Sequence, residues 1–141
     1  MAMDVNAVEV GQELPPYARE AGFPAWNRYA AVNDEFIPIH MDDAAGRAAG
    51  YSGAFGMGNL QWAYLHCLLR EWLDGTDGRI VRVYCQFRLA SEQHHTVTAK
   101  GVVTGVRDED GERIVDLDVW TEIEDATKLA PGSATVAFPL S

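Results

Sequence analysis

A histidine preceded by two carboxylates is the feature of this sequence best suited to acid–base chemistry. Asp34 and Glu35 lie six and five residues before His40, with Pro38 between them and the histidine. Such groups can take a proton from water and supply one to carbon. In the alternative interpretation, His40 caps the helix that follows and the two carboxylates are simply solvated. Spacing alone favours this alternative.

A second segment, residues 53–59, brings glycines to the start of a helix. The N–H groups at a helix N-terminus attract negative charge, and a glycine such as Gly58 lets a ligand approach them closely. A thioester that is becoming an enolate needs such a donor. Ordinary turn formation explains these glycines equally well by itself. A carboxylate–histidine loop followed by a glycine-lined helix start is more informative than either segment alone.

Helices that could position these residues are predicted from composition and periodicity. Residues 24–33 and 44–49 have helical composition, and residues 34–40 between them are expected to form a loop because Pro38 cannot lie inside a regular helix. The longest helix should run from near Gly58 to Asp74. It is apolar nearly all round, so we expect it to be buried on most sides.

Strands fill the rest of the chain. Residues 7–19 are expected to form a lead-in segment, and Tyr84 and Trp120 occupy exposed strand positions that suggest association with another chain. The order of elements predicts an α+β fold, in which an antiparallel sheet wraps around a central helix. The length fits a single domain over residues 1–141. The predicted strands are residues 81–89, 97–106, 114–123 and 133–139, with a hairpin turn at 108–111.

Composition excludes several classes of function. The formal net charge of −10 argues against nucleic acid and anionic membrane surfaces as partners. No apolar run is long enough for a membrane span, and the acidic N-terminus is not a signal peptide, so we expect a cytoplasmic location. Two cysteines and four histidines show no zinc-site spacing, and we expect neither a metal nor a cofactor. Because the protein is acidic, binding of an anionic thioester would require a few arginine or lysine side chains close to the site.

Several motifs of this chain match a known family. The chain resembles the MaoC-like, or R-specific, enoyl-CoA hydratases and dehydratases of the hotdog superfamily, and the resemblance covers nearly the whole chain. The resemblance implies a hotdog fold in which a carboxylate and His40 activate water. It also implies that the Gly58 amide polarises the thioester carbonyl. The matching motifs are Pro38-Ile39-His40, Ala49-Gly50-Tyr51, Gly58, residues 10–16 and residues 130–136.

Three positions depart from the family's pattern. Glu35 occupies the aspartate position, with Asp34 as its substitute if the loop is shifted by one residue. Ile37 stands at the asparagine position, and Met57 replaces the histidine before Gly58. The resemblance therefore gives His40, Glu35 and Asp34 as catalytic candidates and Gly58, Met57 and Ile37 as substrate-binding candidates. The loop is similar to that of subunits of heteromeric steroid enoyl-CoA hydratases.

Three hypotheses about function follow. The first is hydration or dehydration of a 2-enoyl thioester of CoA or of an acyl carrier protein. The second is a weakly active or non-catalytic hotdog subunit that completes the acyl-CoA site of a partner. The third is an acyl-CoA thioesterase, which ranks last because Glu71 is the only carboxylate within the long helix before its Asp74 end. The resemblance implies a homo-oligomer, or a hetero-oligomer with a related hotdog subunit.

Overall fold

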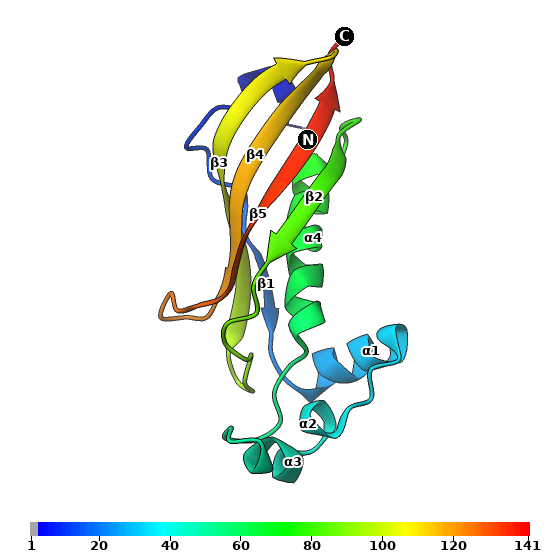
Figure 1. Ribbon diagram of the computed structural model, residues 1–141, viewed down its shortest axis with the longest axis vertical. Coiled ribbons are helices and arrows are strands. Elements are labelled where there is room, and N and C mark those ends of the chain that lie inside the picture. Colours follow the sequence, from blue (N-terminus) through cyan, green and yellow to red (C-terminus); the bar gives the residue numbers. More distant parts are fainter. Residues whose placement is uncertain (1–2) are drawn as a thin grey trace.

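An antiparallel sheet curves around one long helix in the computed structural model of this chain, which describes residues 3–141 (Figure 1). The strand order is β1-β3-β4-β5-β2, and every neighbouring pair is antiparallel. The predicted α+β architecture is therefore confirmed. The strands are β1 (Tyr17–Glu20), β2 (Arg79–Cys85), β3 (Thr96–Glu109), β4 (Glu112–Glu122) and β5 (Lys128–Pro139).

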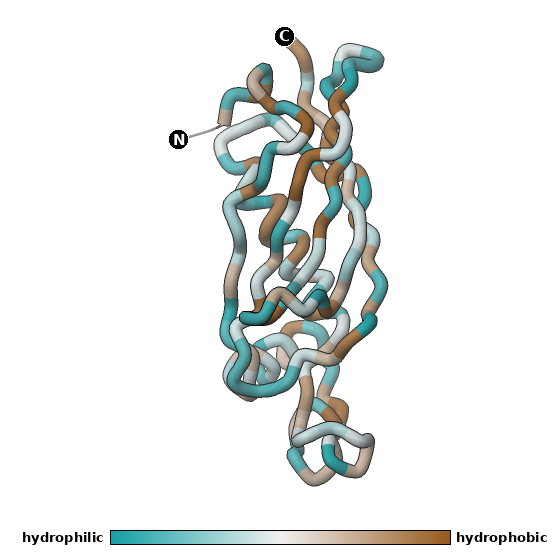
Figure 2. Tube along the Cα trace, turned by 90° about the vertical axis from the view of Figure 1, so that its left-hand side faces the viewer, coloured by the Kyte–Doolittle hydropathy of each residue, from teal (hydrophilic) through white to brown (hydrophobic). Residues whose placement is uncertain are grey.

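The core lies between the sheet and the helix. Along β3 and β4 the buried residues alternate with more exposed ones, as expected for strands that cover a core with one face. Figure 2 shows this alternation of hydrophobic and hydrophilic residues along the strands. The largest fully buried side chains include Trp26, Phe138, Met57, Leu65, Leu68, Leu69 and Leu117.

Helix α4 (Gly58–Leu73) is the long central helix. Eight of its residues are buried, whereas Trp62, Arg70 and Glu71 are exposed, so one side of the helix is not covered by the sheet. The helix ends at Asp74, and Gly75 then adopts a positive φ of 76° that favours glycine. Between residues 3 and 141, no helix is both long and apolar enough to cross a membrane.

The remaining helices gather at the N-terminal end of α4 (Figure 1). The helices in this group are α1 (Phe23–Asn33), α2 (Pro38–Met41) and α3 (Asp43–Ala48), whereas the 3-10 turn η1 (Val5–Ala7) lies at the other end of the molecule. Residues 34–57 run through α2 and α3 before α4 begins, so the segment with the predicted chemistry lies beside the start of the central helix.

Four sequence predictions were wrong in detail. The lead-in segment contains the start of β1, which the short apolar pattern of residues 17–20 did not reveal. Residues 38–41 form a helical turn, because a proline is tolerated at the first position of a helix. Strand β2 spans Arg79–Cys85, so the alternation of residues 86–89 does not extend it. Strand β5 starts at Lys128 and continues through Pro131.

The two aromatic strand positions differ in exposure. Tyr84 is 48% exposed on the edge strand β2, as predicted. Trp120 is only half-buried rather than exposed, because Lys128 Nζ lies 4.4 Å from its ring centroid and its Nε1 donates to Glu122 at 2.7 Å. Of these two side chains, Tyr84 is therefore the one more available to a partner.

Candidate active site

His40 is buried with one ring nitrogen fixed by the protein. The residue is 6% exposed, and its Nδ1 lies 2.6 Å from the carbonyl oxygen of Phe55. A carbonyl oxygen only accepts, so Nδ1 must carry the hydrogen and donate it. In the neutral ring this leaves Nε2 as an acceptor with a free lone pair. The protein has thus set the tautomer that a general base requires.

Local sequence explains why His40 sits on a short helix. Ile37 is extended, as expected before a proline, and Pro38 starts α2. Asp42 ends α2 and also caps α3, where its carboxylate accepts from the N–H groups of Ala44 and Ala45. His40 is therefore held on a rigid turn between two defined ends.

Hydrogen bonds to Asp43 and Ile39 hold the loop that carries the Phe55 carbonyl. The Ala54 N–H donates to Asp43 at 2.9 Å, and the Phe55 N–H donates to the Ile39 carbonyl at 3.1 Å. The hydrogen bond from Ala54 is the main cause that lowers the pKa of the Asp43 carboxyl, and Gln93 adds a further bond at 2.8 Å. Asp43 is thus a supporting residue of the site, and it is not among the six site residues predicted from the sequence.

A cavity of about 240 Å³ opens beside His40 at the N-terminal end of α4. Its walls come from α2, from the loop of residues 51–56, from the start of α4 and from the segment after β2. Residues 40–61 thus meet residues 87–90, which lie far from them in the sequence. The lining residues are His40, Tyr51, Phe55, Gly56, Gly58, Gln61, Phe87, Arg88, Leu89 and Ala90.

Gly58 is the first residue of α4 and lines this cavity. Among residues 3–141 its N–H has no hydrogen-bond acceptor, as expected for the first turn of a helix. A Cβ atom at this position would lie 2.7 Å from the ring of Phe87. A larger residue here would therefore have to displace the Phe87 ring, which the sequence placed only in a predicted strand.

The two candidate carboxylates lie in different environments. Glu35 is half-buried, and its Oε2 is buried without a hydrogen-bond partner among the described residues. Burial raises the pKa of Tyr29, and the negative charge of Glu35 raises it further. Asp34 is exposed, adopts a φ of 51° and ends α1. Neither side chain lines the cavity or bonds to His40 within residues 3–141, but only Glu35 presents a buried acceptor that needs a donor.

The other candidates lie away from the cavity walls. Met57 is 1% exposed and packs in the hydrophobic core, and Ile37 is exposed before α2. Glu71, the carboxylate considered for thioesterase chemistry, is exposed in the last turns of α4. His66 donates through Nδ1 to the Trp62 carbonyl at 3.0 Å. Of the six sequence-predicted site residues, His40 and Gly58 are therefore brought together in one cavity.

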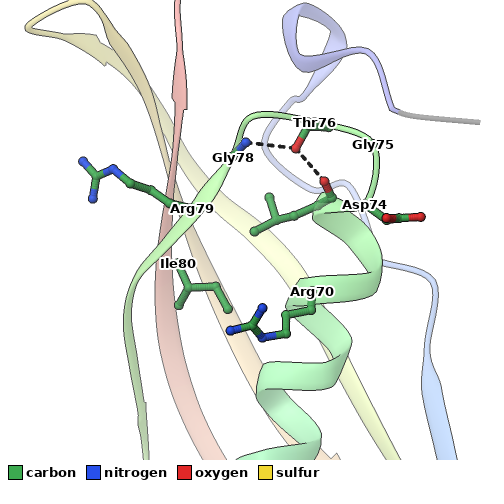
Figure 3. A pocket seen from close by; sticks show the side chains of 8 residues that line it. Arg70, Asp74, Gly75, Thr76, Gly78, Arg79 and Ile80 are labelled. Atoms are coloured by element: carbon green, nitrogen blue, oxygen red, sulfur yellow. Dashed lines mark hydrogen bonds between the residues drawn. The ribbon is translucent and has the colours of Figure 1, made fainter.

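A larger hollow of about 480 Å³ lies at the opposite end of α4 (Figure 3). It is lined by residues 70–80, with Arg70, Asp74 and Arg79 as its charged side chains. Arg79 and Asp74 point away from each other in the view, and Arg79 pairs with Glu112 at 2.8 Å. No histidine or predicted site residue lines it.

No protein-family model matches this sequence, and no curated protein is significantly similar to it. Solved structures are similar in fold over nearly the whole chain. An (R)-hydratase from A. caviae involved in PHA biosynthesis is 24% identical, with a TM-score of 0.84, over 96% of this chain and 100% of that one. A chain of the ChsH1–ChsH2 complex from Mycobacterium tuberculosis is 20% identical, with a TM-score of 0.78, over 92% of this chain and 98% of that one.

A MaoC-like dehydratase from Rhodospirillum rubrum is 13% identical, with a TM-score of 0.77, over 99% of both chains. At these identities the similarity concerns the fold. The chain has the hotdog fold that these MaoC-like proteins share, and the resemblance predicted from the sequence motifs is confirmed at that level.

Proposed function

We propose that this protein adds water to, or removes water from, a 2-enoyl thioester. One observation carries the proposal: His40, with its tautomer fixed by Phe55, lines the same cavity as the acceptor-free amide of Gly58. Hydration of an enoyl thioester needs a base beside the β-carbon and a donor at the thioester oxygen. The hydratase and dehydratase names of structures with the same fold support this choice.

In the proposed reaction, His40 Nε2 and Glu35 hold the water molecule. The water oxygen bonds to the β-carbon as the double bond breaks, and one water proton is delivered to the α-carbon through these residues. The other proton stays on the new hydroxyl. Negative charge that gathers on the thioester oxygen is stabilised by the Gly58 N–H and the positive end of α4. Dehydration is the same sequence in reverse.

Glu35 is the preferred carboxylate because its buried Oε2 has no partner within residues 3–141, and a water molecule or a substrate hydroxyl would supply one. Arg88 lines the cavity and gives an overall acidic protein a local positive charge. A thioester of CoA or of an acyl carrier protein carries phosphate, so Arg88 is placed to attract it. We assign Met57 and Ile37 no direct contact with the substrate.

A second candidate function is that of a subunit in a larger hydratase. The ChsH1–ChsH2 complex has the same fold, and β2 forms a sheet edge with Val81 and Tyr84 about half exposed. Such an edge can pair with another strand. We propose that the protein forms a homo-oligomer or pairs with a related hotdog chain. Native mass of the chain alone and after co-expression with its genomic neighbour tests this, and a monomer in both samples contradicts it.

The test of activity is hydration of crotonyl-CoA by the purified chain, followed as loss of the enoyl absorbance. Parallel detection of free CoA with a thiol reagent distinguishes thioester hydrolysis. Loss of absorbance without free thiol supports the proposal. Release of thiol without hydration points instead to a thioesterase, and inactivity of the chain with and without its partner contradicts both.

A further inference from the structure

Gln61 is a buried polar side chain in the wall of the cavity. It is 2% exposed and lies three residues after Gly58, on the same side of α4. Its neighbours Leu60, Tyr64 and Leu65 are core residues. A buried amide is costly unless its hydrogen bonds are made, so the partners of Gln61 indicate why the helix carries it there.

Two hydrogen bonds fix the orientation of the Gln61 amide. The carbonyl oxygen of Leu89 can only accept, so the atom 3.3 Å from it must be the donor Nε2. Gln61 Oε1 then accepts from the hydroxyl of Thr121, which is fully buried in β4. The side chain thus joins α4 to the sheet through Thr121 and to the segment after β2 through Leu89.

The segment held by this amide forms part of the cavity wall. Phe87 and Leu89 line the cavity, and the Phe87 ring fills the space that a Cβ on Gly58 would need. The segment is no longer part of a strand, and its N–H groups at Arg88 and Leu89 share one acceptor, the Leu129 carbonyl. The Gln61 bond ties this segment directly to the helix that carries Gly58.

We infer that Gln61 is a positioning residue that sets the distance between the Phe87–Leu89 wall and the Gly58 amide. The inference rests on the proposed function for its catalytic consequence, but the mechanical link itself does not depend on that function. The Thr121 hydroxyl orients the amide, and the amide holds the Leu89 carbonyl. The Phe87–Leu89 segment would then hold a thioester at a fixed distance from the Gly58 amide. A displacement of about 1 Å can cost on the order of a hundredfold in rate.

The first test is Gln61→Glu, which changes one group at nearly constant shape. When protonated, the introduced carboxyl can donate to Leu89 and accept from Thr121; when ionised, it can only accept and repels the Leu89 carbonyl. We expect kcat of this variant to fall at least about tenfold as the pH rises through its ionisation. The parent should lack this step. A pH profile identical to that of the parent would overturn the inference.

The second test is the double variant Gln61→Met with Thr121→Val, which removes both polar partners together. Such paired removal can be nearly neutral for stability. We expect a thermal midpoint close to that of the parent, faster hydrogen exchange at the Arg88 and Leu89 amides, and kcat lowered about tenfold or more. Unchanged exchange at these amides overturns the mechanical link, and faster exchange with unchanged kcat overturns its catalytic role. Faster exchange with an inactive parent leaves the link standing and refutes the proposed function.

Discussion

The two ends of α4 differ in what they can do for a ligand. At the N-terminal end the Gly58 amide has no acceptor among residues 3–141, and Gly58 lines a cavity with a buried histidine. At the C-terminal end the Leu73 carbonyl is capped by the Thr76 hydroxyl at 2.6 Å, and Thr76 in turn accepts from the Gly78 N–H (Figure 3). The donor at the first end is available to a ligand, whereas the Leu73 carbonyl at the second end already has a donor within the protein.

The cavity with the candidate catalytic residues is the smaller of the two hollows. The hollow at the C-terminal end is about 480 Å³ and the cavity at His40 about 240 Å³. The larger one is built from a contiguous stretch, residues 70–80, and follows from a tight turn. The smaller one is assembled from residues 40–61 and residues 87–90, which lie far apart in the sequence. Convergence of distant residues with unmatched hydrogen-bonding groups is therefore the better sign of a site.

The largest expected effect comes from His40→Ala. Removal of the base should lower kcat by about a hundredfold to ten-thousandfold, which is the usual contribution of general acid–base catalysis. The matched control is Arg70→Ala at the other end of α4, which should leave kcat within about twofold of the parent. Enoyl absorbance measured with crotonyl-CoA checks both. Near-normal turnover in His40→Ala would remove His40 from the mechanism.

Gly58→Val should have the next largest effect. The added side chain meets the Phe87 ring and crowds the donor at the helix start, so we expect a loss of roughly a hundredfold to a thousandfold in kcat. Circular dichroism and the thermal midpoint verify that the variant is folded. A folded variant with unchanged turnover would exclude the Gly58 amide as the oxyanion donor.

Substitutions of the two candidate carboxylates should have clearly different effects on kcat. Glu35→Gln removes the charge from a half-buried group and should lower kcat by about a hundredfold. Asp34→Asn should change kcat by less than about twofold, because the residue is exposed and asparagine tolerates the same left-handed backbone. Steady-state kinetics of the two variants decides between them. The opposite order would show that the loop acts one residue earlier than proposed.

The smallest effect concerns the pH dependence of stability at the N-terminal end. The Ala54 N–H holds the pKa of Asp43 below its ordinary value of 3.8 in the folded state. Asp43 therefore stabilises the fold at neutral pH, and this contribution is lost as the pH falls through the folded-state pKa. We expect thermal midpoints of Asp43→Asn to decline less than those of the parent between about pH 5 and pH 3.

The control for this measurement is Asp77→Asn near the C-terminal end of α4. Asp77 is exposed and makes no hydrogen bond within the part of the chain that the structure describes. Its midpoints should follow those of the parent throughout the titration. Equal declines in the parent and in Asp43→Asn would remove Asp43 as a support of the site.

Sequence predicted the fold well where periodicity was long. The 16-residue helix α4 and the strands β3 and β4 repeat their patterns over many residues, and each was placed within a few residues of its observed bounds. The four-residue strand β1 and the single turn of α2 are too short for a periodic signal. Strand β1 is defined by its pairing with β3, which the sequence alone does not display.

The site was predictable only in part, for a similar reason. His40 and Gly58 lie in motifs close together in the sequence, and both reach the cavity. Phe87 and Gln61 contribute through contacts across the fold, with Gly58 and Leu89 respectively. The place of a glutamine beside the apolar residues of the helix was the signal that could have singled out Gln61. The Phe55 carbonyl, which fixes the tautomer of His40, carries no side-chain signal at all.

The most direct test of the site at the N-terminal end of α4 is a crystal structure of the protein with a bound 3-hydroxyacyl thioester. We predict that the thioester oxygen lies about 2.7–3.1 Å from the Gly58 nitrogen. The 3-hydroxyl group should lie within hydrogen-bonding distance of His40 Nε2, at about 2.6–3.2 Å. An acyl group seated instead in the hollow between Arg70 and Arg79, with His40 and Gly58 untouched, would contradict the account.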